Sequence, residues 1–341
     1  MVCSGHKFGQ HPFDQVFTSC NPWIRDIKLL QISVASSSLL AIPVIESIIE
    51  SSHTLGSIIT TPDRKSGRGQ TLTQTELADW ADARGIPVAK PDSTSSLNQH
   101  LLSAQPQMII TLSYGRMIPV ELLHGPRFGW LNVHFSLLPR WRGAAPVQWA
   151  LLEGDTHTGI SIFKLDKGMD TGPIYYQEEV SINADDTTEV LLESMSQLAG
   201  ERILDVITTI TKAVKPTPQP TAGVTLAPKI TKEMSELDWS QSADTLLRKS
   251  RALRVRPGTW SNFRGERIAI GALAESLEVN QLGDCGEISA VNGKLLVRCQ
   301  DSVLEILEIT PAGKKKMGGA DFARGARLVT GESFTHSAKN T

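Results

Sequence analysis

The sequence predicts an α/β protein, with a mostly parallel β-sheet in a first domain and a small β-barrel in a second. Three observations lead to this prediction. A length of 341 residues suits about two domains. Strand-like and helix-like segments alternate through the first two-thirds of the chain, which is typical of a parallel sheet with helices on both faces. Short strand-like segments, mostly separated by glycines, fill much of the last third, which is typical of small barrels.

The first domain is expected to span residues 27–211. Apolar runs predict strands at 27–35, 55–61, 86–89, 107–112 and 130–135, and longer segments predict helices at 40–50, 73–84, 145–153 and 187–211. The polar stretch 62–70, rich in Gly and Arg, is expected to be a loop. Ligands of such folds bind beyond the carboxyl ends of the strands, so the functional site is expected among the loops there.

A proline-rich segment, residues 212–228, separates the two expected domains. It contains Pro216, Pro218, Pro220 and Pro228. Closely spaced prolines favour a semi-rigid linker. In the second domain (229–330), a helix at 242–252 and strands at 266–272, 286–291, 294–299 and 303–310 suggest an OB-like barrel. Residues 1–26 are expected to be a disordered N-terminal extension, and residues 331–341 a tail.

Composition excludes several classes of protein. Hydrophobic residues make up 40% of the chain and charged residues 21%, which argues against disorder over most of its length. No apolar run approaches the roughly 18 residues of a membrane helix, and the first 26 residues lack the apolar core of a secretory signal. The four cysteines (Cys3, Cys20, Cys285 and Cys299) have no zinc-ligand spacing. We therefore expect a metal-free protein of the reducing cytoplasm.

The net charge of -2 hides an asymmetry along the chain. From Lys212 onward, 19 Lys and Arg stand against 14 Asp and Glu, a local charge of +5. The rest of the chain has 15 basic and 22 acidic residues, a local charge of -7. A basic part on an acidic chain favours a polyanionic partner for that part.

Asn132 and His134 are the first candidates for catalysis. They are two residues apart in an expected strand, so their side chains lie on the same face. An N-x-H pair alone more often consists of buried core residues whose hydrogen bonds are all made within the protein. Here, however, Ser-Leu-Leu-Pro follows at 136–139, Arg-Gly-Ala-Ala-Pro at 142–146, and a polar loop, Asp-Lys-Gly-Met-Asp-Thr-Gly, at 166–172. Asp170 in that loop is the third candidate.

From residue 132 to residue 172 the chain resembles the catalytic core of the 10-formyltetrahydrofolate-dependent formyltransferases. The motifs N-x-H-x-S-L-L-P, R-G-A-A-P, T-G-I-S-I and D-x-G-x-D-T-G occur in that family's order and spacing. Further motifs resemble those of the family members that act on methionyl-tRNA. They are P-D-R and G-R-G at 62–69, S-Y-G at 113–115, I-P at 118–119, D-W-S at 238–240, R-P at 256–257 and P-A-G-K-K at 311–315. The resemblance covers about residues 27–329. It implies a Rossmann-like formyltransferase domain that uses 10-formyltetrahydrofolate to formylate methionine on initiator tRNA.

The resemblance implies a role for each candidate residue. Asn132 and His134 would donate N–H groups to the oxygen that becomes negative during formyl transfer. Preorganised donors of this kind contribute about 2.7–4 kcal/mol. Asp170 would take the proton of the attacking amine and help to return one to the leaving nitrogen, which typically contributes about 10²–10⁴-fold.

The resemblance also implies two binding surfaces. The folate is expected near Tyr114 and near the turn of Ser136, Leu137, Leu138 and Pro139. The initiator tRNA is expected to contact basic residues, because phosphate contacts position a nucleic acid on its protein. These candidates are Arg64, Lys65 and Arg68 in the first domain, and Arg254, Arg256, Lys314, Lys315 and Lys316 in the second. Neither a metal nor a membrane is expected as a partner, and the protein is expected to act as a monomer.

Two places depart from the family pattern. The run 36–38 (Ser-Ser-Ser) and Leu40 stand where the family usually has Gly-Thr or Gly-Ser and then an aromatic residue. Loss of a glycine limits the backbone freedom of that loop. Phe135 stands where the family generally has a small residue. It either crowds the site or, as the strand neighbour of His134, points away from it.

Three other interpretations compete with formyl transfer to tRNA. Residues 170–172 spell the Asp-Thr-Gly of aspartic proteases, but those enzymes need two carboxylates that share a proton, and the sequence has no second such tripeptide. A formyltransferase acting on a sugar amine or a glycinamide nucleotide would share the core, yet it would need neither the basic second domain nor the stretch 62–70. An RNA-binding protein with an inactive formyltransferase-like domain would not need all three candidate catalytic residues intact.

Overall fold

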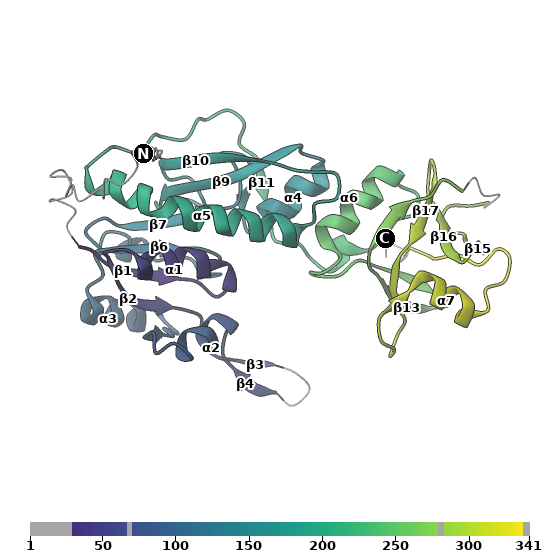
Figure 1. Ribbon diagram of the computed structural model, residues 1–341, viewed down its shortest axis with the longest axis horizontal. Helices are drawn as coiled ribbons and strands as arrows, with labels where there is room; N and C mark the ends of the chain where they lie inside the picture. Colours follow the sequence, from purple (N-terminus) through teal and green to yellow (C-terminus); the bar gives the residue numbers. More distant parts are fainter. Residues whose placement is uncertain (1–28, 67–69, 279–282, 337–341) are drawn as a thin grey trace, which may run out of the picture.

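The structure is a computed structural model that describes residues 29–66, 70–278 and 283–336. The expected N-terminal extension, residues 1–26, lies outside the described residues, as does Arg68. The described residues fold into two domains that lie side by side along the long axis of the molecule (Figure 1). Both domains predicted from the sequence are therefore present.

The first domain is built around a seven-stranded sheet with the order β10-β9-β7-β6-β1-β2-β5. Its strands are β1 (Gln31–Ala35), β2 (Thr54–Ile59), β5 (Val88–Ala89), β6 (Met108–Thr111), β7 (Trp130–His134), β9 (His157–Lys164) and β10 (Ile174–Ser181). The first five run parallel, whereas β9 pairs antiparallel with both β7 and β10. The mostly parallel sheet is confirmed, and β9 and β10 extend it beyond the predicted strands.

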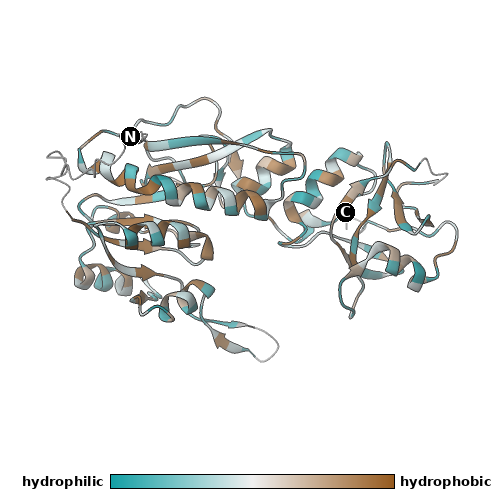
Figure 2. Ribbon diagram, viewed as in Figure 1, coloured by the Kyte–Doolittle hydropathy of each residue, from teal (hydrophilic) through white to brown (hydrophobic). Residues whose placement is uncertain are grey.

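Helices cover both faces of this sheet. They are α1 (Ile42–Glu50), α2 (Glu76–Asp82), α3 (Thr94–Ala104), α4 (Pro146–Glu153) and α5 (Thr188–Thr211), with 3₁₀ turns η2 (Leu39–Ala41) and η3 (Val120–Leu122). Neighbouring strand residues face opposite sides. Ile110 therefore packs in the core shared with α1 and α5, whereas Ile109 packs with α3. Figure 2 shows the apolar residues gathered on the strands and on the sides of the helices that meet them.

The second domain consists of antiparallel strands around a core of its own. One sheet contains β12 (Trp260–Phe263), β13 (Glu266–Ile270), β18 (Glu308–Thr310) and β19 (Met317–Gly318). The other contains β14 (Leu273–Glu275), β17 (Val303–Ile306), β16 (Lys294–Arg298) and β15 (Ile288–Val291). The 3₁₀ turn η4 (Glu233–Ser235) and α7 (Gly319–Ala326) complete the domain. Side chains from both sheets, including Phe263 and Leu295, share one buried cluster, in agreement with the small β-domain that the sequence predicts.

The stretch 62–70, expected to be a loop, contributes a strand to a hairpin. β3 (Arg64–Ser66) pairs antiparallel with β4 (Thr71–Thr73). The hairpin projects from the body of the first domain (Figure 1). β3 and β4 are almost entirely polar, so they show no alternation of apolar and polar residues from which a strand could be predicted.

Helix α6 (Ala243–Leu253) joins the two domains through buried contacts. Its last two residues, Ala252 and Leu253, belong to the hydrophobic core of the first domain. Thr188 at the start of α5 donates a 2.8 Å hydrogen bond from Oγ1 to the Ala252 carbonyl. The domains therefore share packed surface and are not joined by the linker alone.

Candidate active site

A cavity of about 580 Å³ lies at the carboxyl ends of β6 and β7. Asn132, His134 and Asp170 all line it, so the structure brings the three predicted catalytic residues together. The volume falls within the roughly 300–1,000 Å³ that is typical of small-molecule sites. The position agrees with the rule that places ligands of open α/β sheets beyond the carboxyl ends of the strands.

The orientation of Asn132 is set by Thr111 on the neighbouring strand. The two residues are partners in the register of β6 and β7. Thr111 Oγ1 lies 2.6 Å from Asn132 Oδ1 and donates to it. Because Oδ1 is held in this way, the amide N–H groups of Asn132 are left for the cavity. Sequence reasoning missed Thr111, whose only signal is a polar residue at the end of an apolar strand.

His134 is held by the backbone of the loop that follows β7. Its ring nitrogen Nε2 lies 2.9 Å from the Trp141 carbonyl. A carbonyl oxygen can only accept, so Nε2 carries a proton. Nδ1 points the other way, towards Asp170, whose Oδ2 lies 3.8 Å from it. In the neutral ring Nδ1 is therefore a proton acceptor, and once protonated it becomes a donor beside a carboxylate.

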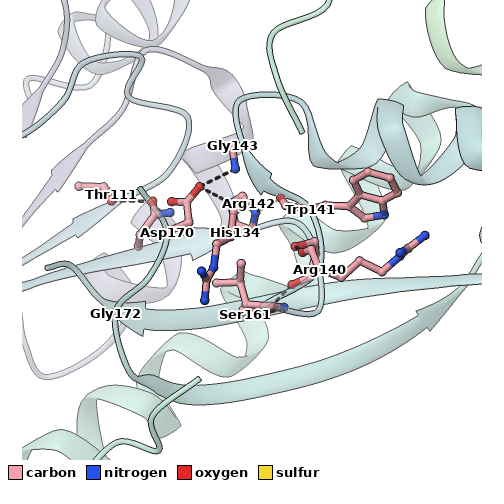
Figure 3. A network of polar contacts seen from close by, with 12 residues as sticks. Thr111, His134, Arg140, Trp141, Arg142, Gly143, Ser161, Asp170 and Gly172 are labelled. Atoms are coloured by element: carbon pink, nitrogen blue, oxygen red, sulfur yellow. Dashed lines mark hydrogen bonds and ion pairs between the residues drawn. The ribbon is translucent and has the colours of Figure 1, made fainter. Parts of the chain in front are cut away.

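The carboxylate of Asp170 is positioned by the backbone of Gly143. The Gly143 N–H donates a 2.8 Å hydrogen bond to Asp170 Oδ2. Figure 3 shows His134, Gly143 and Asp170 meeting at one point, with Thr111 beside them. Asp170 itself has a φ of 53°, in the left-handed region that few side chains other than Asn and Asp adopt.

The remaining motif residues fold the turn that presents Asp170. Asp166 Oδ1 accepts hydrogen bonds from the Gly168 N–H at 2.9 Å and from Thr171 Oγ1 at 2.6 Å. A Cβ at Gly172 would lie 1.7 Å from the Lys164 carbonyl oxygen, so only glycine fits there. The D-x-G-x-D-T-G pattern thus encodes a particular turn in addition to a carboxylate.

The proline-rich segment supports a loop that borders the site. β11 (Leu226–Ala227) within it pairs in parallel with β8 (Arg142–Gly143), which lies in the loop of residues 139–145. Gly143 has a φ of 132°, and a Cβ there would lie 2.5 Å from the Ala227 carbonyl oxygen. The Trp141 N–H donates to Thr225 Oγ1 at 2.8 Å. The segment predicted as a spacer therefore also binds the loop that carries Gly143.

The predicted folate residues fall into two groups. Tyr114 lines the cavity. Burial raises the pKa of its phenol, an effect that the nearby Arg116 partly opposes. The turn of Ser136, Leu137, Leu138 and Pro139 is not among the described residues that line the cavity. Hydrogen bonds hold that turn: Ser136 Oγ donates to the Arg140 carbonyl at 2.6 Å, and the Leu138 N–H donates to Ser161 Oγ on β9 at 3.0 Å.

Of the positions that depart from the family pattern, Leu40 and Phe135 border the same cavity. Leu40 lines it. Among the residues that the structure describes, those with a positive φ do not include the serines at 36–38, so the loop needs no glycine there. Phe135 is 5% exposed and packs in the core beneath α1 and α5, although it also reaches the cavity wall. Phe135 therefore points partly away from the site, into the core, and partly into the cavity wall.

The predicted tRNA contacts lie in two places. Arg64 and Lys65 are exposed on the β3–β4 hairpin. In the second domain, Arg254 and Lys316 line a smaller cavity of about 170 Å³. Lys316 is paired with Glu308 at 3.1 Å. The remaining second-domain candidates, Arg256, Lys314 and Lys315, are exposed.

The described residues show neither a cluster of metal-ligand side chains nor a helix suited to a membrane. Within residues 29–66, 70–278 and 283–336, no three His, Cys, Asp or Glu side chains are grouped so that they could hold a metal ion. None of the helices in the same part of the chain combines the length and the apolarity that crossing a bilayer requires.

Comparison with known proteins agrees with this geometry. Residues 30–207 match the family model described as Formyl transferase, and residues 229–327 match the model described as Formyl transferase, C-terminal domain. A methionyl-tRNA formyltransferase from Salinispora tropica is 36% identical over 307 residues, which cover 89% of this chain and 99% of that protein.

Solved structures show the same fold. The methionyl-tRNA formyltransferase from Clostridium thermocellum superposes with a TM-score of 0.52 at 18% identity, over 82% of this chain and 99% of that one. HypX from Aquifex aeolicus in complex with tetrahydrofolic acid gives a TM-score of 0.65 at 17% identity, over 90% of this chain. This chain spans 51% of HypX, so the likeness concerns about half of that protein.

Proposed function

The chain belongs to the formyl transferase family, and from this premise we propose that Asn132, His134 and Asp170 form its reacting centre. Its relative at 36% identity is matched over 99% of its length and is a methionyl-tRNA formyltransferase. The protein accordingly transfers a formyl group from 10-formyltetrahydrofolate to the α-amino group of methionyl-initiator tRNA, for translation initiation. The observation that carries the assignment of residues is their convergence on one cavity.

The cavity suits a folate co-substrate. 10-Formyltetrahydrofolate supplies the formyl carbon and the leaving nitrogen N10. Apolar side chains, among them Ile118, Leu123 and Leu165, form part of the wall, where a flat pterin ring would be shielded from water. Tyr114 adds a phenol, which is a hydrogen-bond donor at neutral pH. The turn at 136–139 does not line the cavity, so of the predicted folate residues Tyr114 is the one that we retain for direct contact.

The three residues divide the chemistry among them. The amine of methionine attacks the formyl carbon as its new C–N bond forms, and the formyl oxygen gains negative charge. The N–H of Asn132 faces the cavity and donates to that oxygen, a contact that is strongest when the charge has developed. The N–H of His134 is already donated to the Trp141 carbonyl, so we assign His134 to proton transfer and not, as the resemblance implies, to the formyl oxygen. Asp170, paired with Nδ1 of His134, accepts the proton that the amine loses. The same proton then goes to N10 as the bond from N10 to the formyl carbon breaks, which leaves tetrahydrofolate and the formylated amine.

The initiator tRNA is held by cationic side chains of both domains. We assign phosphate contacts to Arg64, Lys65 and Arg68 of the first domain, and to Arg254, Arg256 and the lysines 314–316 of the second. Cationic side chains suit this role because they neutralise backbone phosphates without reading the sequence. We further propose that the protein acts as a monomer in the cytoplasm.

A comparison of acceptors tests this function. Charged initiator tRNA, charged elongator methionine tRNA and a nucleotide-linked amino sugar would each be incubated with 10-formyltetrahydrofolate and the protein. Formation of N-formylmethionyl-tRNA from the initiator at a much higher kcat/KM than from the others is the expected result. Formyl transfer to the amino sugar alone would replace the tRNA by a small amine as the substrate.

A further inference from the structure

A single glutamine in the proline-rich segment contacts both loops of the active site. Gln219 Nε2 donates to the Asp170 carbonyl and to the Gly172 carbonyl, each at 2.8 Å. Gln219 Oε1 accepts from Arg142, at 2.6 Å from Nη2 and 3.1 Å from Nε. The amide therefore uses both its donor and its acceptor to connect the 166–172 turn to the 139–145 loop.

These bonds act where the backbone is under strain. A left-handed φ is unfavourable for residues other than glycine, although less so for Asn and Asp. Asp170 adopts this conformation, with φ at 53°. The conformation persists only if its surroundings hold it. Gln219 fixes the carbonyls of Asp170 and Gly172, on both sides of Thr171, and so it restrains the part of the turn from which the Asp170 carboxylate projects.

The segment that carries Gln219 is itself anchored at both ends. Before Gln219, Thr217 exchanges two 2.8 Å backbone hydrogen bonds with Ile174 at the start of β10. After it, β11 pairs with β8, and Trp149 Nε1 donates to the Pro228 carbonyl at 2.8 Å. A proline lies on either side of Gln219, and the ring of each fixes its φ. The backbone around the half-buried Gln219 therefore has little freedom. The Gln219 amide is thus held in place by a rigid segment, residues 217–228, which we call the strap.

We infer that Gln219 is a positioning residue for formyl transfer, which it serves by holding Asp170 and Arg142 in one arrangement. The inference rests on the proposed function, because it gives Asp170 a part in the reaction. It also assigns a second role to the strap, which leads directly into the tRNA-binding domain at residue 229. Gln219 acts through Asp170 and does not touch the reacting atoms.

Two substitutions separate positioning from stability. Gln219→Ala removes all the contacts of the amide. Gln219→Glu keeps the shape and the oxygen that accepts from Arg142, but it replaces the N–H donors by an oxygen that the carbonyls of Asp170 and Gly172 repel. Gln99→Ala is the matched control, since Gln99 is an exposed glutamine on α3. For each variant, kcat, the KM for both substrates, and Tm would be measured.

Both Gln219 variants are expected to lower kcat by about 10–100-fold, since misplacing a reacting group by about 1 Å can cost on the order of 100-fold. The KM values are expected to stay within about twofold, because the binding surfaces are untouched, and Gln99→Ala should match the wild type. If Gln219→Ala unfolds, Gln219→Glu decides the matter.

A Gln219→Glu variant with wild-type kcat, or one whose only change is a higher KM, would overturn the inference while leaving the proposed function in place. A wild-type chain that transfers no formyl group to methionyl-tRNA would overturn the proposed function first, and the role of Gln219 with it.

Discussion

His134 Nδ1 lies 3.8 Å from Asp170 Oδ2, while the opposite ring nitrogen donates to the Trp141 carbonyl at 2.9 Å. The second contact fixes the tautomer of the neutral ring and so leaves Nδ1 as the atom that can gain a proton. In the proposed mechanism the imidazole and the carboxylate act as one group that takes a proton from the amine and gives it to N10.

Joint action of this pair predicts non-additive losses. Asp170→Asn and His134→Gln are each expected to lower kcat by about 10²–10⁴-fold, the usual contribution of general acid–base help. The double variant is expected to be only slightly worse than the poorer single variant, because residues that act as a unit are not additive. Single-turnover rates for the four proteins test this. Losses that multiply in the double variant would mean that the two residues act independently.

Thr111 orients Asn132, and its hydroxyl should matter for the rate. Thr111→Val keeps the shape of the side chain but removes the donor to Asn132 Oδ1. One net hydrogen bond is worth about 0.5–1.5 kcal/mol, so kcat is expected to fall by roughly threefold to tenfold. Thr111→Ser retains the hydroxyl and serves as the control. Equal rates for the Val and Ser variants would show that Asn132 needs no such support.

Gly143 is expected to tolerate no side chain. Gly143→Ala would place Cβ 2.5 Å from the Ala227 carbonyl oxygen and so displace the N–H that donates to Asp170. Overpacking typically costs about 1–3 kcal/mol, which corresponds to a fall in Tm of roughly 2–10 °C, and kcat should fall as well. Gly325→Ala on α7 meets nothing within 4 Å and is the control. Unchanged Tm and kcat in Gly143→Ala would contradict the packing described.

The exposed lysines of the second domain are expected to act on tRNA binding alone. Replacing Lys314 and Lys315 together by glutamine should raise the KM for charged tRNA and leave kcat unchanged. The slope of log affinity against log salt should become shallower by about one for each phosphate that is no longer neutralised. Replacing Arg84 and Arg127, two exposed cations of the first domain, removes the same charge as a control. If both double variants weaken binding equally, net charge and not a local interaction would be responsible.

The fold class and the grouping of Asn132, His134 and Asp170 in one cavity could be predicted because their signals are local. Asn132 and His134 share a strand face, and the alternation of apolar segments shows the parallel sheet. Helix α3 was missed because only Leu97 and Leu101 of its residues are buried, too few to set a helical period. Strand β10 has exposed and half-buried residues along its whole length, which also hides it from a hydrophobic pattern.

The support of the site could not be predicted because it is made by contacts between distant residues. Gln219 reaches Asp170 across 49 positions of sequence, and Thr225 reaches Trp141 across 84. Prolines around Gln219 indicate stiffness, but nothing in their spacing indicates what the stiff segment binds. Only the folded chain shows that the linker also supports the two loops that carry Gly143 and Asp170.

The most direct test of the central claim measures formyl transfer to charged initiator methionyl-tRNA at fixed salt, for the wild type and for Asp170→Ala. Asp205→Ala, which removes an exposed carboxylate on α5, controls for charge. Transfer by the wild type and the control, with a loss of about 10²-fold or more in Asp170→Ala, is the predicted result. Full activity in Asp170→Ala would contradict the mechanism, and no transfer by the wild type would contradict the function itself.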